Sequence, residues 1–310
     1  MLHKALVYKS TGSWYVARTE DGRVWSCRTR GKLKIDTDIT STNPVAVGDS
    51  VDLQIEDDNS NKAIITSIYD RHNYVVRESN HNKNLRQIIA SNVDQALLIA
   101  TIEQPKTSLG FIDRFLISCE SRHVPAIIWF NKSDILSEEG KAYFNNAKEI
   151  YNTAGYEVHL SHQHDDEALQ QLKQILHNKI TLVSGHSGVG KSTLINYIIP
   201  DADITTMEVS EWSGKGMHTT TYAEMYNLPS GGKIIDTPGI RELGVIDIEK
   251  EELAGYFPEL RKAAKACKYN NCIHVNEPQC AVQAAVREGQ LHVERYESYL
   301  NILATIREKW

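Results

Sequence analysis

The 310-residue sequence predicts an α/β protein, with a small β-barrel before the α/β domain and a helical domain after it. Three observations support this fold class. Short β-branched and aromatic runs separated by turn signals fill residues 1–72. Predicted strands and helices alternate through residues 73–240. Cysteines and a histidine cluster within residues 241–310. We therefore expect domain boundaries near residues 72 and 240.

The composition is typical of a globular protein, with 41% hydrophobic and 24% charged residues. No apolar run approaches the roughly 18 residues that a membrane span needs, and the polar N-terminus does not resemble a signal peptide. Five cysteines, an odd number, indicate a reducing compartment. We expect a cytoplasmic protein that does not associate with membranes. Its formal charge is −6, but residues 73–240 carry 14 Lys and Arg against 19 Asp and Glu, so either end can still present a basic face.

The first segment is expected to form a five-stranded barrel of the oligonucleotide-binding (OB) type. Asp21-Gly22 is a hairpin signal between two of its predicted strands. Two interpretations remain for the basic residues around Trp25: an RNA-contacting face with one stacking ring, or a solvated hairpin with Trp25 in the core. The predicted strands are residues 6–8, 14–17, 23–27, 50–55 and 63–68. The basic residues are Arg23, Arg28, Arg30, Lys32 and Lys34.

The middle segment alternates buried strands with amphipathic helices, which is typical of a mostly parallel sheet. Such sheets bind ligands at the carboxyl ends of their strands. The predicted strands are residues 96–100, 124–130, 156–160, 180–183 and 233–235. The predicted helices are residues 111–122, 138–154, 166–178 and 193–199.

Residues 185–192 match the phosphate-loop pattern G-x-x-x-x-G-K-[ST] without a mismatch, between a predicted strand and a predicted helix. Glycines let backbone N–H groups face an anion, and the helix N-terminus adds partial positive charge. Lys191 is expected to reach the β- and γ-phosphates, and Ser192 to ligate Mg²⁺. The other expected nucleotide contacts from this loop are Gly185, Ser187, Gly188, Val189, Gly190 and Thr193.

Two further loops follow predicted strands and indicate guanine nucleotides. Residues 131–134 match N-K-x-D, in which the carboxylate of Asp134 can accept hydrogen bonds from guanine N1–H and the exocyclic amine together. Asn131 can bond the base, and the stem of Lys132 can cover the ring. Residues 236–239 match D-x-x-G, in which Asp236 would hold Mg²⁺ through water and the N–H of Gly239 would meet the γ-phosphate.

The order of these motifs is circularly permuted. Ordinary GTPases carry the phosphate loop first, then D-x-x-G, then N-K-x-D, whereas here N-K-x-D precedes the phosphate loop. The same sheet forms if the chain enters it at a different strand. The segment after Asp236, which senses the γ-phosphate, then runs directly into the C-terminal domain.

Residues 212–221 predict a loop that orders around Mg²⁺, with either Thr219 or Thr220 as the metal ligand. Ile240 stands where Ras-like enzymes carry a water-orienting glutamine, so intrinsic hydrolysis should be slow. His218 is the nearest polar candidate for that role. The alternative is that His218 is a solvent-facing loop residue.

The last segment contains a complete ligand set for structural zinc. Cys267, Cys272, His274 and Cys280 supply three thiolates and one imidazole within 14 residues, leaving no open position for catalysis. Helices are expected on both sides, over residues 253–266 and 281–308. The basic residues on the first of them are either phosphate contacts or a solvated face. They are Arg261, Lys262, Lys265 and Lys268.

Together these motifs resemble the ribosome small-subunit-dependent GTPase family (RsgA/YjeQ) over essentially the whole chain. The resemblance also rests on residues 44–49 near the end of the barrel and on the Gly216-x-His218-Thr219-Thr220-Thr221 loop. It implies a GTPase that binds the small (30S) ribosomal subunit late in maturation, is stimulated by it, and leaves after hydrolysis. It further implies that the barrel and the zinc domain bind ribosomal RNA, that His218 acts in catalysis, and that Ser161 belongs to a loop behind the guanine base.

The expected cofactors are GTP or GDP, Mg²⁺ and one structural Zn²⁺. The expected partners are the small subunit and its rRNA, with other assembly factors as further candidates, and the chain is expected to be a monomer. Two alternatives come from other classes. A GTP-binding RNA scaffold with little hydrolysis fits the missing glutamine, and a metabolic phosphate-loop kinase fits the phosphate loop alone.

Overall fold

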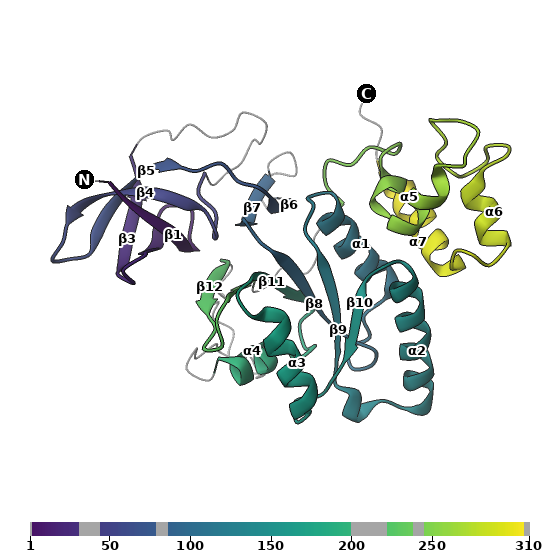
Figure 1. Ribbon diagram of the computed structural model, residues 1–310, viewed down its shortest axis with the longest axis horizontal. Coiled ribbons are helices and arrows are strands. Elements are labelled where there is room, and N and C mark those ends of the chain that lie inside the picture. The colour runs from purple at the N-terminus through teal and green to yellow at the C-terminus, as the bar shows by residue number, and fades with distance from the viewer. Residues whose placement is uncertain (1, 31–43, 79–85, 200–221, 238–244, 307–310) are drawn as a thin grey trace, which may run out of the picture.

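A computed structural model describes residues 2–30, 44–78, 86–199, 222–237 and 245–306. Three bodies lie in a row: a barrel at the N-terminal end, a sheet flanked by helices in the middle, and a helical body at the C-terminal end (Figure 1). Within the described residues, no helix is both long and apolar enough to span a membrane.

The N-terminal body is a closed five-stranded barrel. Its strand order is β1-β2-β3-β5-β4, and pairing of β1 with β4 closes it. Alternate residues of each strand fill its interior, as the two-residue period of a strand requires. All five predicted strands are confirmed. They are β1 (Leu2–Ser10), β2 (Tyr15–Thr19), β3 (Val24–Thr29), β4 (Ser50–Asp57) and β5 (Lys62–Ile68).

Trp25 belongs to the barrel core, so that interpretation of Trp25 is confirmed and the alternative, a stacking ring for RNA, is wrong. Only 2% of its surface is exposed, and its Nε1–H donates to the Thr19 hydroxyl at 3.2 Å. Buried and exposed residues alternate along β3, so Trp25 and Cys27 lie on its inward face and Arg28 on its outward face. Two of those cations are already paired, Arg23 with Asp58 and Arg28 with Glu56.

A two-stranded hairpin, β6 (Tyr74–Glu78) and β7 (Arg86–Ser91), connects the barrel to the central sheet. It was not predicted. Gly48 fixes it to the barrel, because a Cβ there would lie 2.0 Å from the Ser91 carbonyl O and its φ is +94°. The buried carboxylate of Asp49 completes the joint by accepting from the guanidinium of Arg71 and the hydroxyl of Ser91.

The central sheet has the order β10-β9-β8-β11-β13-β12, parallel except for β12. β12 also pairs with β1 at Glu224↔Lys9, so this sheet and the barrel are one continuous eleven-stranded sheet. That junction was not predicted either. The strands are β8 (Gln95–Thr101), β9 (Ala126–Asn131), β10 (Glu157–Leu160), β11 (Ile180–Gly185), β12 (Glu224–Asn227) and β13 (Lys233–Asp236).

Two helices cover each face of this sheet. Ala96, Leu98 and Ala100 of β8 face the cluster that contains α1 and α2, whereas Leu97 and Ile99 face the cluster that contains α3 and α4. These four helices match the predicted ones within a few residues. They are α1 (Leu109–Glu120), α2 (Glu138–Thr153), α3 (Asp166–Leu176) and α4 (Lys191–Ile198).

The C-terminal body is helical, but both predicted helices are broken. Pro258 begins α5 and cannot continue the preceding 3₁₀ turn, because proline lacks a backbone N–H. The second predicted helix is broken after α6, where Gly289 follows the C-cap residue at φ +71°. The pieces pack on a core of their own that also takes in Ile117 of α1. They are η3 (Leu253–Tyr256), α5 (Pro258–Ala264), α6 (Ala281–Arg287) and α7 (Val293–Thr305).

Candidate functional site

The parallel register brings the three nucleotide motifs to one edge of the sheet. Thr101 of β8 pairs with Asn131 of β9, and Ile99 pairs with Gly185 at the end of β11. On the other side of β11, Val183 pairs with Asp236 at the end of β13. The loops that leave these strands therefore meet at the carboxyl edge, where α/β sheets bind their ligands.

Contacts between these motifs constrain the phosphate loop. The side-chain N–H of Asn131 donates to the Val189 carbonyl at 3.0 Å, and Val189 is fully buried. Gly190, at φ +86°, lies so close that a Cβ would be 2.4 Å from Asn131 Nδ2. A Cβ on Gly185 would lie 2.4 Å from the Ile99 carbonyl O. Gly190 is thus required for the contact between the phosphate loop and N-K-x-D, and Gly185 for the close approach of the loop to β8.

The accessible side of this loop carries the predicted phosphate contacts. Ser187, Gly188 and Thr193 are exposed, and Lys191 and Ser192 are half-buried at the first turn of α4. An exposed backbone at a helix N-terminus matches the requirement for binding an anion.

Lys191 and Asp236 form a direct ion pair between the phosphate loop and the D-x-x-G motif. Both side chains are largely buried, at 12% and 6% exposure. The following residue, Thr237, is fixed by donation from its hydroxyl to the Val183 carbonyl at 3.0 Å. The predicted phosphate-binding lysine and the predicted magnesium-binding aspartate therefore lie within reach of the same ligand.

The N-K-x-D loop turns sharply after β9. Lys132 adopts φ +64°, and its Nζ donates to the Gln104 carbonyl at 2.7 Å. Asp134 is exposed and lies in the 3₁₀ turn η1 (Ser133–Ile135). Ser161 braces this loop: its carbonyl accepts from Ser133 N–H at 2.9 Å. Its fully buried hydroxyl accepts from Trp129 Nε1–H at 2.7 Å, and its role toward the base stays a prediction.

The loop between β8 and α1 also belongs to this edge, although the sequence analysis did not select it. It contacts Lys132 through Gln104, and Pro105 lies 3.5 Å from the site where a Cβ of Gly188 would be. At the start of α1, the ring of Phe111 packs on His186 of the phosphate loop with centroids 3.7 Å apart. The signal for this loop was its position after a buried strand.

Several predicted residues lie outside the described part of the chain. These are the metal-ligand candidates Thr219 and Thr220, the catalytic candidate His218, Gly239 of D-x-x-G, Ile240, and Lys32 and Lys34 of the first segment. Their proposed roles stay predictions.

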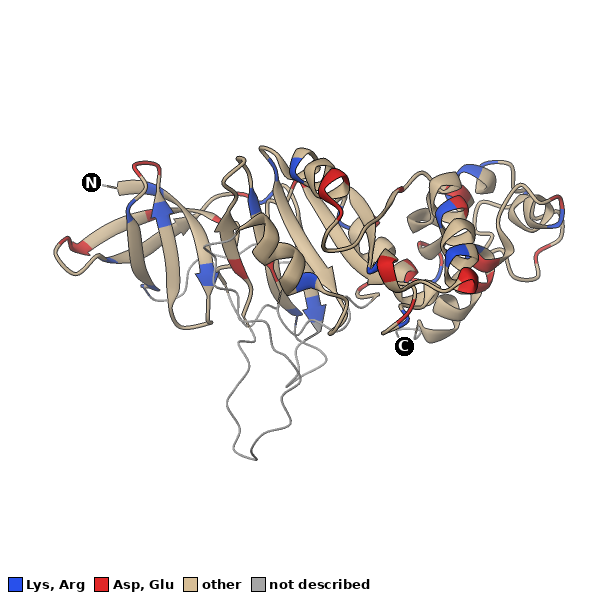
Figure 2. Ribbon diagram, turned by 90° about the horizontal axis from the view of Figure 1, so that it is seen from below, with Lys and Arg blue, Asp and Glu red and all other residues tan. Residues whose placement is uncertain are grey.

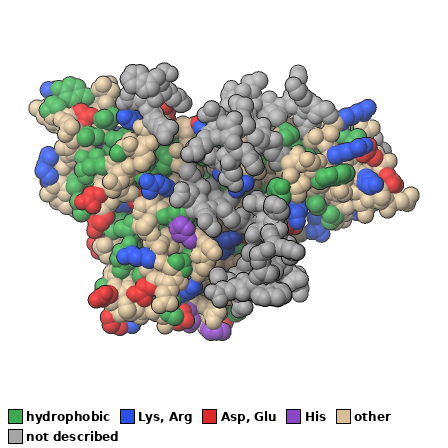
Figure 3. Space-filling model, turned by 180° about the vertical axis from the view of Figure 1, so that it is seen from behind, with side chains coloured by type: hydrophobic (Ala, Val, Ile, Leu, Met, Phe, Trp, Pro, Cys, Tyr) green, Lys and Arg blue, Asp and Glu red, His purple; other side chains and the backbone are tan. Residues whose placement is uncertain are grey.

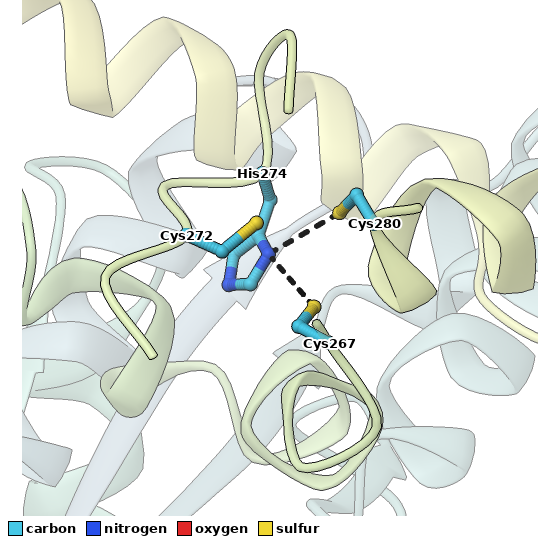
Figure 4. Close-up of side chains that lie close together, drawn as sticks. All are labelled: Cys267, Cys272, His274 and Cys280. Carbon is cyan, nitrogen blue, oxygen red and sulfur yellow. Dashed lines mark hydrogen bonds between the residues drawn. The ribbon is translucent and has the colours of Figure 1, made fainter. Parts of the chain in front are cut away.

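The four predicted zinc ligands do converge (Figure 4). Their ligand atoms all lie within 4.8 Å of one another, and Nδ1 of His274 is 3.6 Å from Cys267 Sγ and 3.4 Å from Cys280 Sγ. Tetrahedral zinc with ordinary Zn–S and Zn–N bonds separates its ligand atoms by roughly 3.5–3.8 Å. The cluster therefore fits one zinc ion.

The surroundings of the cluster also suit zinc. Burial lowers the pKa of His274, so near neutral pH the ring is uncharged and can offer a lone pair. Backbone N–H groups of Ala281 and Gln283 point at the sulfurs of Cys267 and Cys280, at 3.3 and 3.5 Å. Burial and the neighbouring thiols raise the pKa of Cys272 to about 12, so a cation is needed to keep these sulfurs deprotonated together.

The basic residues beside the zinc cluster are exposed. Arg261 lies 3.4 Å from Glu120, and Lys268 lies over the Tyr269 ring. Lys262 and Lys265 also face solvent. On the face drawn in Figure 3, described basic, acidic and hydrophobic side chains are interspersed. Contact with RNA phosphates by these residues stays a prediction.

Comparison with known proteins assigns the chain to one family. The model of a family described as RsgA GTPase matches residues 68–246, and one described as RsgA N-terminal domain matches residues 4–65. The chain belongs to the RsgA GTPase family. A relative from Cytophaga hutchinsonii, called small ribosomal subunit biogenesis GTPase RsgA, is 48% identical over 97% of both chains. The protein of the same name from Flavobacterium psychrophilum is 46% identical over 96% of this chain and 91% of its own.

Two solved structures match the chain over almost its whole length. YloQ, a circularly permuted GTPase, matches with a TM-score of 0.75 and 29% identity over 100% of this chain and 98% of its own. YjeQ from Thermotoga maritima matches with a TM-score of 0.78 and 29% identity over 99% of this chain and 100% of its own. The predicted circular permutation is confirmed, and the chain is a GTPase that uses GTP, GDP and Mg²⁺.

Proposed function

We propose that this GTPase binds the small ribosomal subunit during late maturation, hydrolyses GTP to GDP and phosphate when stimulated by the subunit, and then leaves. The names of relatives that are 46–48% identical over almost the whole chain support the subunit as partner. A factor of this kind works in the cytoplasm, and we expect it to act as a monomer. Other assembly factors are further candidate partners.

The observation that carries the proposal is the meeting of Asn131, Lys191 and Asp236 at one sheet edge. We assign Asn131, Lys132 and Asp134 to the guanine base. Backbone N–H groups of the phosphate loop and Lys191 would hold the phosphates. Ser192, Asp236 and one of Thr219 and Thr220 would hold Mg²⁺, which neutralises phosphate charge when bound.

Nucleotide binding must break the ion pair between Lys191 and Asp236. In this ion pair each side chain neutralises the other. In the loaded protein Lys191 turns to the phosphates and Asp236 to the metal, so the pair separates. Asp236 ends β13, and the chain then leads toward the zinc-binding body. Loading is thereby coupled to the C-terminal end of the protein.

For the hydrolysis itself we assign His218 to orient the attacking water, since Ile240 cannot do so through a polar group. A slow intrinsic rate and strong stimulation by the subunit follow if the subunit brings His218 into place. We also propose that Cys267, Cys272, His274 and Cys280 hold one structural Zn²⁺, and that domain boundaries lie near residues 72 and 240. The barrel and zinc-binding body would contact rRNA.

The test is steady-state GTP hydrolysis by the purified protein, alone and with small subunits, with large subunits as the control. We expect stimulation by small subunits only, and we expect His218→Ala to remove it while GDP affinity is retained. Equal rates with and without small subunits would reject the ribosomal part of the proposal and leave a GTP-binding protein with little hydrolysis.

A further inference from the structure

A cleft of about 420 Å³ lies where the barrel meets the central sheet. β1 and β12 pair only at Lys9↔Glu224, where an ion pair of 2.8 Å joins them. Toward the start of β1 the strands are linked by side chains instead: the Tyr8 hydroxyl donates to Asn227 Oδ1 at 2.7 Å. The cleft opens beyond this contact and has the end of β2 as a further wall.

The lining of this cleft is basic, although the chain as a whole is acidic. Lys4, Arg18 and Lys233 line it, and Glu20 is its single carboxylate among the described residues. Lys4 lies in β1 and Arg18 in β2 of the barrel, whereas Lys233 begins β13 of the central sheet. Figure 2 shows Lys and Arg on strands of both the barrel and the adjoining sheet.

No carboxylate in the described part of the chain forms an ion pair with these three cations. Arg18 donates from Nε to the Gly22 carbonyl at 3.1 Å, and Lys4 lies 5.0 Å from the centre of the Tyr69 ring. The half-buried Lys233 side chain makes no hydrogen bond or ion pair with any residue that the structure describes. Three positive charges that face one cleft repel each other, and an anion between them would relieve that repulsion.

Uncharged donors complete the lining. Asn227 accepts from Tyr8 through Oδ1, and its side-chain NH₂ donates to no other described residue. The Ser50 hydroxyl also lines the cleft. Burial raises the pKa of Tyr8, so the phenol stays neutral and adds no negative charge. Ammonium, guanidinium, amide and hydroxyl donors together match a phosphate group, which offers only acceptors.

We propose that this cleft binds backbone phosphates of RNA, with Lys233, Arg18 and Lys4 as the contacting cations. The volume is that of an ordinary small-ligand site, large enough for one nucleotide unit of a strand. RNA as the source of the phosphate rests on the proposed function. The alternative source, a free phosphate or nucleotide, has the same chemistry.

The cleft is separate from the GTP site. Lys233 begins β13 and pairs with Ile180, whereas Asp236 ends β13 and pairs with Val183. The two residues are three steps apart along the strand, which is about 10 Å. The cleft therefore lies at the amino edge of the sheet and the GTP site at the carboxyl edge. An RNA strand here would bridge β1 and β13, and so hold the barrel against the sheet.

The test is binding of a labelled single-stranded RNA to the full-length protein, by fluorescence anisotropy, across a range of salt concentrations. Lys233→Ala should lower the slope of log K against log salt by about 0.7, which is about fivefold in affinity at 0.1 M salt. Glu20→Gln removes the carboxylate and should strengthen binding. Lys141→Ala, an exposed lysine of α2 outside the cleft, is the matched control and should leave binding unchanged.

Three results would overturn the proposal. One is unchanged RNA binding in both Lys233→Ala and Glu20→Gln. Another is equal weakening by Lys233→Ala and Lys141→Ala, which would indicate a general charge effect. The third is inorganic diphosphate binding that depends on Lys233 while RNA binding does not, which would assign the cleft to a free anion. Stimulation of the wild-type protein by small subunits, measured in parallel, tests the proposed function separately. Lys233 lies outside the catalytic machinery, so a failure of the cleft proposal would leave that result unaffected.

Discussion

Replacing Arg295 with methionine should weaken the attachment of the C-terminal body to the GTPase body. Arg295 of α7 is 2% exposed and pairs with Asp113 of α1 and, at 2.6 Å, with Glu259 of α5. Burial opposes its charge, but these two carboxylates raise the pKa of Arg295 above the ordinary value. Tyr151 adds a hydrogen bond to Asp113 at 2.9 Å. One guanidinium therefore joins two bodies through groups that are cut off from water.

The magnitude follows from what Arg295→Met leaves behind. Methionine fills most of the volume, so the main loss is the counter-charge of two buried carboxylates. Removing one partner of a buried ion pair costs about 3–5 kcal/mol. Replacing the whole set with uncharged residues of similar shape is often close to neutral. The triple variant Asp113→Asn, Glu259→Gln, Arg295→Met should therefore recover much of the stability that Arg295→Met loses.

The assay is urea unfolding followed separately in the two bodies, with double-mutant cycles for each pair. Because the chain has several bodies, each transition is fitted on its own. We expect Arg295→Met to unfold the C-terminal body first, at lower urea than wild type. If Arg295→Met were as stable as wild type, or if the triple variant were no better than Arg295→Met, the ion pairs would not hold the bodies together.

Three further predictions concern other parts of the chain. Cys280→Ser, or treatment with a chelator, should remove the bound zinc and lower the Tm of the C-terminal body. The control Cys27→Ala should keep its zinc. Equal zinc content in the two variants would contradict the ligand assignment. Hydrogen bonds from Ser137 lower the pKa of Glu103, so Glu103→Gln should lower the Tm near pH 7. The difference between the two proteins should vanish as the pH falls through the folded-state pKa of Glu103, which lies below the ordinary glutamate value. A difference that persisted in acid would exclude this origin. Gly190→Ala should weaken GDP binding roughly tenfold or more by displacing Asn131, whereas Gly155→Ala, with a similar φ and open space, should leave GDP binding unchanged.

The elements that the sequence predicted best are those with strong local signals. The phosphate loop needs glycines at fixed positions, and its flanking strand and helix have clear periodicity, so residues 185–192 lie where expected. The zinc ligands were predictable because four such side chains within 14 residues must fold close together.

The features that the sequence did not predict depend on distant contacts. The pairing of β1 with β12 joins residues more than 200 positions apart, and the Asp113–Arg295 pair joins two helices across a body boundary. Neither has a local pattern. Trp25 was ambiguous because alternation along a short strand does not say which face is inward until the barrel closes. The break at Pro258 was readable in principle, since proline often begins a helix.

The central claim is that the permuted motifs form one guanine-nucleotide site, and nucleotide titration tests it most directly. Wild-type protein should bind GDP far more tightly than ADP. Asp134→Asn should lose about 10- to 100-fold in GDP affinity, because it removes charge-assisted hydrogen bonds to the base, and should gain affinity for xanthosine diphosphate, whose carbonyl can accept from the new amide. Equal affinities of the wild-type protein for GDP and ADP, or unchanged GDP binding by Asp134→Asn, would contradict the account.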